Sequence, residues 1–288
     1  MKNYDWLRVL KILFPYIFVV GFFQYLAYLI LGIQVSIKPR DINIYQKVVI
    51  AIFTVLGTFL VIWAFNKYVD KQKFNVFQLN KFNKKSFFYG LAIGIIIMCL
   101  GFAILFFTNQ IFLKTIQCNF SNFLLSIVFF ACVSFNEEFL MRGYVLNNLL
   151  NSFNKFISLI ISAILFALMH FANPYLNSLS FVNLFLAGIL LGSFYIYTKN
   201  LWFSFGLHFS WNFFQGTILG FSVSGIKFPS ILMQERLENN IWNGGDFGFE
   251  GSMLCLVFQI ISIIAVYRLF KQRNFRMLMY SGYNDIPD

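Results

Sequence analysis

The sequence predicts an all-α, polytopic integral membrane protein with about eight transmembrane helices. Of its 288 residues, 59% are hydrophobic and only 11% are charged, whereas a soluble domain carries roughly 25% charged residues. Apolar runs long enough to cross a bilayer recur along the whole chain; such a crossing needs roughly 20 residues. Since no polar stretch is long enough for a separate soluble domain, we expect one helical membrane bundle.

The expected spans are eight apolar segments: 12–33, 47–66, 87–107, 121–142, 156–172, 180–198, 201–220 and 252–270. The first is too long for the core of a signal peptide and lacks a small-residue cleavage site, so a retained helix is expected. The fourth is expected to continue past Arg142 toward Leu150. The fifth is short and ends before Pro174, because proline disfavours helix in the residue that precedes it.

Lysine and arginine in the short loops predict the orientation. They are concentrated at the N-terminus, in the 67–85 loop and in the C-terminal tail: Lys2, Arg8, Lys11, Lys67, Lys71, Lys73, Lys81, Lys84, Lys85, Arg268, Lys271, Arg273 and Arg276. Short basic loops favour the cytoplasmic side, and with eight spans these three regions share one side. Both termini are therefore expected in the cytoplasm, with Lys38, Arg40 and Lys47 as exceptions near the first outer loop.

The net charge of +11 follows the same pattern. Basic clusters beside apolar segments favour contact with anionic lipid, so a lipid bilayer is the expected partner and nucleic acid is not. The four cysteines show no CxxC spacing and are expected as buried hydrophobes rather than disulfides. The glycine-rich 221–251 loop is expected to be a flexible connector or a lid, and not a source of chemistry.

Residues 137–142, Glu-Glu-Phe-Leu-Met-Arg, place charges inside the fourth apolar segment. A charged side chain at membrane depth costs about 2.5–3.5 kcal/mol on insertion scales. Glu138 and Arg142 are four residues apart and can pair on one helical face. Glu137 projects about 100 degrees away and is free to act as a general base. The alternative is that both glutamates only form a salt-bridge cluster that locks the helix.

The two histidines of the chain also lie in apolar segments. Phe166 precedes His170 by one helical turn and shapes its surroundings, while His208 and Asn212 share a face at four-residue spacing. Such a pair of donors could hold a developing oxyanion. The alternative for each is structural: His170 as a satisfied core residue, and Asn212 in a hydrogen bond between helices.

These three motifs, in this order, resemble the CPBP family, the CAAX-protease and bacteriocin-processing (Abi) intramembrane peptidases. The pattern EExxxR, FxxxH and HxxxN is supplied by Glu137-Glu138…Arg142, Phe166…His170 and His208…Asn212. The resemblance implies a helical bundle that encloses a hydrophilic cavity and a catalytic core over residues 85–271. Two N-terminal helices with a basic loop would form residues 1–84, and a cytoplasmic tail residues 272–288.

The resemblance also implies roles for these residues. Glu137 would activate water with help from His170, and His208 and Asn212 would bind the oxyanion. Glu138, Arg142 and Phe166 would support the site. No cofactor is expected to be required. Zinc is the alternative, with Glu137, His170 and His208 as its ligands, although the HExxH spacing of many zinc peptidases is absent.

The expected function is an intramembrane endopeptidase that acts on a membrane-embedded, lipid-modified, bacteriocin or signal-precursor peptide. The composition, rich in Phe, Asn and Ile, suggests an AT-rich genome, and a bacterial source is expected. One alternative is a non-catalytic immunity or regulatory protein that binds a membrane-protein partner and keeps the motifs for packing. A proton-coupled transporter is disfavoured, because no paired halves or matching broken helices are evident.

The depths of Glu137 and His170, estimated from the helical rise per residue, conflict with their expected joint role. At 1.5 Å per residue, Glu137 lies about 24 Å from the start of the fourth segment, which places it near the cytoplasmic side. His170 lies about 21 Å along the fifth segment from Phe156, on the opposite side of the bilayer. The two residues would then be too far apart to act together unless the fifth helix is tilted or enters the membrane later than expected.

Overall fold

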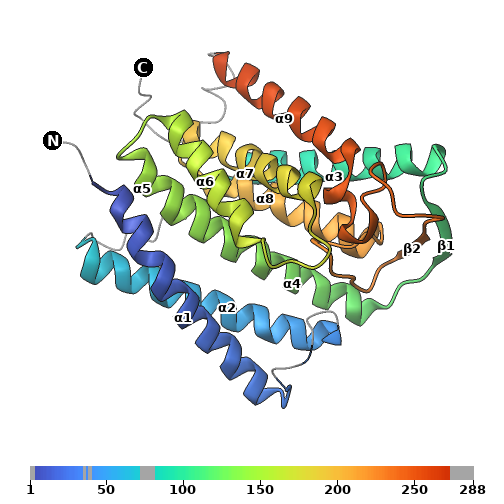
Figure 1. The fold of residues 1–288 in the computed structure, drawn as a ribbon, viewed down its shortest axis with the longest axis horizontal. Helices are drawn as coiled ribbons and strands as arrows, with labels where there is room; N and C mark the ends of the chain where they lie inside the picture. Colours follow the sequence, from blue (N-terminus) through green and yellow to red (C-terminus); the bar gives the residue numbers. More distant parts are fainter. Residues whose placement is uncertain (1–3, 35–36, 38–40, 72–81, 273–288) are drawn as a thin grey trace.

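The computed structural model describes residues 4–34, 37, 41–71 and 82–272, and within them the protein is a bundle of helices (Figure 1). Six helical segments of the described residues are long and apolar enough to cross a membrane. They are α1 (Trp6–Ile30), α2 (Ile44–Ala64) with a π-helical end (Phe65–Val69), α3 (Lys84–Phe107), the segment Phe120–Leu150, α7 (Ser178–Thr198) and α9 (Met253–Lys271). The all-α, polytopic fold predicted from composition is confirmed.

The fourth of these segments has three parts. It begins as α4 (Phe120–Glu138), continues as a π-helix (Phe139–Leu146) and ends as α5 (Asn147–Leu150). The predicted fifth and seventh spans are shorter helices, α6 (Lys155–Met169) and α8 (Leu201–Phe213), the latter extended by a π-helix (Phe214–Ile218). All eight predicted segments are therefore helical. Among the described residues, α6 is shorter than a full crossing, and α8 with its π-helical extension is not one of the six candidate spans.

Two short strands were not predicted. β1 (Phe112–Ile116) pairs antiparallel with β2 (Leu232–Glu235), with a bulge between Leu113 and Thr115. Lys114 and Glu235 form an ion pair across the two strands. The small sheet joins the α3–α4 connection to the long segment between α8 and α9, at the end of the molecule opposite the first turn of α1 (Figure 1).

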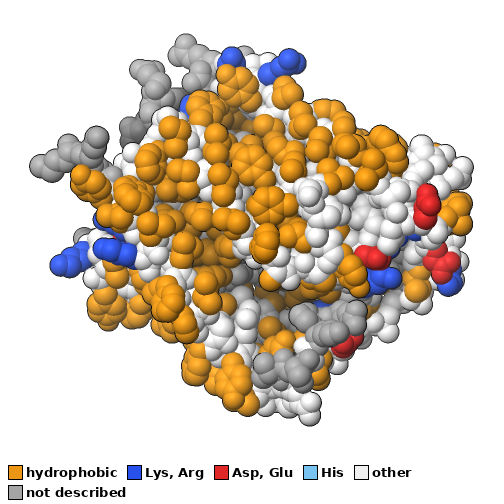
Figure 2. Space-filling view, viewed as in Figure 1, with side chains coloured by type: hydrophobic (Ala, Val, Ile, Leu, Met, Phe, Trp, Pro, Cys, Tyr) orange, Lys and Arg blue, Asp and Glu red, His pale blue; other side chains and the backbone are white. Residues whose placement is uncertain are grey.

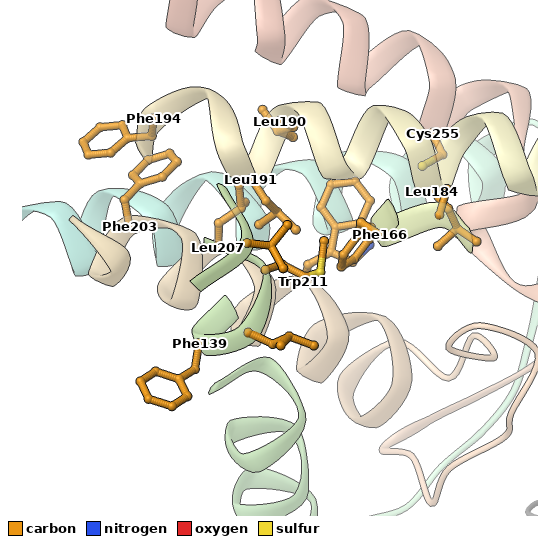
Figure 3. Close-up of a cluster of buried hydrophobic side chains, with 14 of the residues drawn as sticks. Phe139, Phe166, Leu184, Leu190, Leu191, Phe194, Phe203, Leu207, Trp211 and Cys255 are labelled. Atoms are coloured by element: carbon orange, nitrogen blue, oxygen red, sulfur yellow. The ribbon is translucent and has the colours of Figure 1, made fainter. Parts of the chain in front are cut away.

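The helices form a core in which the N-terminal hairpin covers one side. α1 packs on α2, α2 packs on α4, and α4 contacts α8; on the other side α6 packs on α7 and α7 on α9. Apolar side chains from α6, α7 and α8 meet between these layers, among them Phe166, Leu191, Leu207 and Trp211 (Figure 3). This cluster lies beside the helix segments that carry the three sequence motifs.

Glycines bring α3 and α8 into direct backbone contact. A Cβ on Gly90 would lie 2.1 Å from the carbonyl oxygen of Phe203, and one on Gly206 would lie 2.4 Å from the carbonyl oxygen of Phe87. Small residues at such crossings let membrane helices pack closely where lipid offers no hydrophobic driving force. This contact fixes the position of α8, the helix that carries His208.

The surface agrees with a protein surrounded by lipid. Hydrophobic side chains cover most of the face in Figure 2, while charged side chains gather at its ends. Large exposed apolar residues such as Phe14, Leu56 and Ile261 lie on α1, α2 and α9.

Several residues used for the orientation lie outside the described part of the chain: Lys2, Lys38, Arg40, Lys73, Lys81, Arg273 and Arg276, together with nearly all of the predicted tail. The predicted cytoplasmic location of the termini stays a prediction.

Candidate active site

The glutamate pair lies where the long helix changes its winding. Glu137 and Glu138 close α4, and the π-helix begins at Phe139. π-Helical turns are rare and often mark functional sites, because they redirect side chains within a continuous helix. The two carboxylates leave the helix in different directions, as the sequence predicts, and enter different surroundings.

Glu138 is buried, and one of its carboxylate oxygens has polar partners from its own helical segment and from α8. Its Oε1 accepts a hydrogen bond from Arg142 Nη1 at 3.0 Å and contacts His208 Nδ1 at 2.8 Å. Arg142 Nη2 donates to the carbonyl oxygen of Gly188 on α7, at 3.0 Å. The side chains of Glu138 and Arg142 are only 2% and 0% exposed, respectively. A buried carboxylate needs such partners, and these hold α4, α7 and α8 together.

Glu137 faces both histidines instead. Its Oε2 lies 3.6 Å from His170 Nε2 and 3.9 Å from His208 Nε2. Each imidazole is oriented through its other nitrogen, since His170 Nδ1 lies 2.8 Å from the carbonyl oxygen of Phe166 and His208 Nδ1 is held by Glu138. A partner on one ring nitrogen fixes both the ring plane and the role of the other nitrogen. Both Nε2 atoms therefore converge on one carboxylate oxygen.

Phe166 lies between the charged groups of the site. The Arg142 guanidinium sits 4.9 Å from the centre of its ring. The ring centroids of His170 and His208 lie 4.7 Å and 6.2 Å from it. A cation over an aromatic face is favourable, and more so away from water. The aromatic ring thus supports three of the residues that the motifs identify.

A cavity of about 580 Å³ opens in front of these groups. Glu137, His170, His208 and Asn212 all line it, so the structure brings together the four residues that the sequence predicts for catalysis. His208 and Asn212 are 7% and 5% exposed, respectively, and come from one face of α8. Much of the remaining wall is apolar and includes Phe166, Leu191 and Trp211. Such a cavity can hold a peptide segment and exclude bulk water from it.

The cavity wall also contains residues that the motifs do not include. Tyr16 of α1 and Thr54 of α2 belong to it, as do Ser224 and Glu250 of the segment between α8 and α9. Asn136, next to the glutamate pair, lies 3.4 Å from the Tyr16 hydroxyl through its Nδ2. The 221–251 loop, expected as a connector or a lid, contributes directly to the wall. In the sequence Glu250 is one of four acids of this loop, with Glu235, Glu238 and Asp246, and nothing but its place at the glycine-rich end beside the last apolar segment distinguishes it.

The conflict in depth arose because the estimate left out the expected continuation of the fourth segment. The helix continues 13 residues beyond Glu137 to Leu150, and α6 begins at Lys155. At 1.5 Å per residue, Glu137 lies about 20 Å above that turn and His170 about 22 Å above it. The two residues are therefore at the same depth, and no unusual tilt of α6 is needed.

The described residues offer no group of three or more His, Cys, Asp or Glu side chains that could hold a metal ion. Glu137, His170 and His208 meet at the cavity wall, where Glu137 Oε2 lies 3.6 Å and 3.9 Å from the two Nε2 atoms. A zinc ion would lie about 2.0–2.2 Å from each ligand atom, and these three residues would be its ligands if a metal took part. We derive no step of the reaction through a metal.

The family model for type II CAAX prenyl endopeptidases (Rce1-like) matches residues 118–214. The matched stretch begins just before α4, ends just after α8 and contains all three motifs. The match confirms the family resemblance predicted from those motifs and supports a peptidase in a multi-pass membrane protein. No curated protein and no solved structure matches the chain.

Proposed function

We propose that this protein is an intramembrane endopeptidase in which Glu137 activates the attacking water. The observation that carries the proposal is the convergence of His170 Nε2 and His208 Nε2 on Glu137 Oε2 at the wall of one cavity. Ionisable groups at membrane depth are expensive and mark functional sites. Here two histidines from other helical segments approach one oxygen of Glu137. This arrangement of three ionisable side chains fits catalysis better than a role in helix packing.

In the proposed reaction Glu137 removes a proton from water as the oxygen attacks the scissile carbonyl. His170 donates through Nδ1 to the carbonyl oxygen of Phe166, so the Nε2 of the neutral ring is free to accept the second water hydrogen and align the nucleophile. The protonated Glu137 then gives its proton to the leaving amine. Positioned acid–base groups of this kind contribute typically about 10²–10⁴-fold to the rate.

His208 and Asn212 stabilise the negative charge that develops on the carbonyl oxygen. Glu138 Oε1 accepts a hydrogen bond from His208 Nδ1, and in the imidazolium form the ring also donates from Nε2. Asn212 adds an amide N–H from one turn further along α8. Donors fixed in advance in a site of low polarity give large stabilisation of an oxyanion. Glu138 and Arg142 act through His208 and are positioning residues.

The proposed substrate is a membrane-embedded or lipid-modified peptide, or a bacteriocin or signalling precursor. The cavity is bounded largely by apolar side chains and lies between helices with lipid-exposed faces. An apolar peptide segment or acyl chain would leave the bilayer for this cavity without exposure to water. The alternative is a non-catalytic immunity or regulatory protein that uses the same cavity to bind a membrane partner.

The test compares purified wild type with Glu137→Gln on a library of transmembrane peptides. Glutamine keeps the size of the side chain but cannot take a proton, so we expect cleavage to fall by about 10²–10⁴-fold. Glu235→Gln, on the exposed strand β2, is the matched control and should retain activity. Equal cleavage by wild type and Glu137→Gln would refute the mechanism.

The same assay decides whether a metal takes part. We propose that turnover is independent of an obligate metal, so activity should persist after treatment with a zinc chelator. Loss of activity in chelator, with recovery on addition of zinc, would replace this proposal by a metal-dependent one. Absence of cleavage by wild type, with an intact biological phenotype in Glu137→Gln, would favour the non-catalytic alternative.

A further inference from the structure

A third carboxylate faces the cavity from outside the three motifs. Glu250 belongs to a short 3₁₀ turn, Phe249–Gly251, that directly precedes α9. It lines the same cavity as Glu137, His170 and His208. The proposed hydrolysis does not use it. An acid beside a substrate cavity that takes no part in the chemistry is a candidate for substrate recognition.

The backbone around Glu250 is fixed by buried contacts. Asn183 on α7 is fully buried, and its Nδ2 donates to the carbonyl oxygens of Glu250 at 2.7 Å and Ser252 at 2.9 Å. The ring of Phe249 is 0% exposed and packs near Trp211 and Phe221. The carboxylate is therefore carried by a rigid part of the loop.

The side chain of Glu250 is also held in place. Its Oε2 accepts hydrogen bonds from the backbone N–H of Ser224 at 2.9 Å and from the Ser224 hydroxyl at 2.8 Å. Ser224 has a φ of 48°, a left-handed conformation that is costly for a residue other than glycine and often occurs at functional sites. With Oε2 occupied by Ser224, Oε1 is the oxygen available to a molecule in the cavity.

Among the described residues, no ion pair neutralises Glu250. Glu138 is paired with Arg142, whereas no Lys, Arg or His atom lies within ion-pair distance of Glu250 among the residues described. Lys47 is the one Lys or Arg among the described cavity residues, and it lies at the start of α2, close to Phe228. Burial raises the pKa of the Glu250 carboxyl. The hydrogen bonds from Ser224 and the electrostatic interaction with His170 and His208 act in the opposite direction and are smaller.

We propose that Glu250 is a specificity residue that binds a cationic side chain, lysine or arginine, of the substrate peptide. This proposal rests on the peptidase function proposed above and names one feature of its substrate. The aliphatic stem of such a side chain would lie along the apolar wall of the cavity while its charged end reaches Oε1. A bound cation also stabilises the ionised carboxyl, which offsets the cost of its burial.

The experiment measures binding in the Glu137→Gln background, so that cleavage does not interfere. The probes are fluorescent transmembrane peptides with one lysine placed at successive positions, each paired with the same peptide carrying acetyl-lysine. Acetylation keeps the stem and removes the charge. A hydrogen bond to a charged group corresponds to about tenfold or more in affinity, so at one position the lysine peptide should bind at least tenfold more tightly.

Glu250→Gln should bring that ratio close to one. The variant keeps an oxygen that accepts from Ser224, and its melting temperature in detergent should match that of the parent. Glu250→Lys should reverse the preference toward a peptide with glutamate at the same position. Equal binding of both peptides at every position, or a ratio unchanged by Glu250→Gln, would overturn the proposal.

The two proposals can fail separately. Wild type that binds the lysine peptide selectively but does not cleave it would support the role of Glu250 and refute the peptidase function. Wild type that cleaves peptides without regard to lysine would support the peptidase and refute the role of Glu250.

Discussion

Glu138 and Arg142 show what an ionic pair can do in the interior of this bundle. The pair is fully buried, and it extends to His208 on α8 and to the carbonyl oxygen of Gly188 on α7. A buried ion pair contributes little net stability, but removal of one partner leaves an uncompensated charge. The two residues therefore determine the position of His208 more than they stabilise the fold.

Replacement of Arg142 tests this role. In Arg142→Met, Glu138 loses its cation and His208 loses a fixed partner, so we expect a loss of about 3–5 kcal/mol of stability together with loss of activity. The double variant Glu138→Gln/Arg142→Met removes both charges and should recover much of the melting temperature but not the activity. Melting curves in detergent and the peptide assay measure the two effects. Additive losses in the double variant would contradict the proposed coupling.

At the scale of single residues, spacing predicted the pair within one helix, whereas contacts between helices were expected only from the family resemblance or were missed. Spacing of four residues was enough to expect Glu138 beside Arg142, and they do pair. The bond of His208 to Glu138 spans 70 residues, and no spacing rule applies over that length. Glu250 was missed for a similar reason. Its partner Ser224 is 26 residues away, in a segment without regular structure, where no spacing rule applies.

At the scale of helices, close packing and π-helical turns position the site. The long fourth segment changes to π-helix directly after Glu138, and α8 changes directly after Phe213, one residue beyond Asn212. Two of the three motif-bearing helices, α4 and α8, therefore change their winding next to their motif residues. The glycine contact between α3 and α8 then fixes the depth of His208 and Asn212.

A larger residue at Gly206 tests the importance of that contact. The Cβ of any residue there would lie 2.4 Å from the backbone oxygen of Phe87, so Gly206→Leu must push α8 away from α3. We expect a lower melting temperature and loss of activity, since overpacking costs typically about 1–3 kcal/mol. Gly21→Leu on α1 is the matched control, because nothing lies within 4 Å of its Cβ position. Equal behaviour of the two variants would refute the argument.

Helices were predictable because their apolar runs are long, whereas the other elements carry weak signals. β1 and β2 have five and four residues, too few for an alternating pattern to be distinguished from chance. The fourth segment was expected to continue to Leu150 and does so. The depth conflict arose because that continuation was left out of the estimate, and α6 needs no special explanation.

At the scale of the whole molecule, the cavity is assembled from distant parts of the chain. The N-terminal hairpin contributes Tyr16 and Thr54, the motif helices contribute the ionisable groups, and the segment before α9 contributes Glu250. The predicted division at residues 84 and 85 follows the family resemblance, while the cavity extends across it. The family model covers the helices that carry the motifs, whereas part of the cavity wall comes from outside the matched residues.

The orientation in the membrane is the prediction that belongs to this scale. The basic residues Lys67, Arg268 and Lys271 should lie in the cytoplasm, which places the β1–α4 connection on the outer side. Cys118 is exposed in that connection, and Gln272 is exposed at the end of α9. One variant would keep Cys118 alone of the four cysteines, and a second would carry only Gln272→Cys.

A membrane-impermeant maleimide added to intact cells should label the first variant and not the second. Permeabilised cells should give labelling of both, which shows that each thiol is reactive. If the labelling is reversed, the termini face outward and Glu250 enters the cavity from the cytoplasmic side. With the expected result, the loop that carries Glu250 is an outer one, and the cationic group of the substrate must reach the cavity from the outer half of the bilayer.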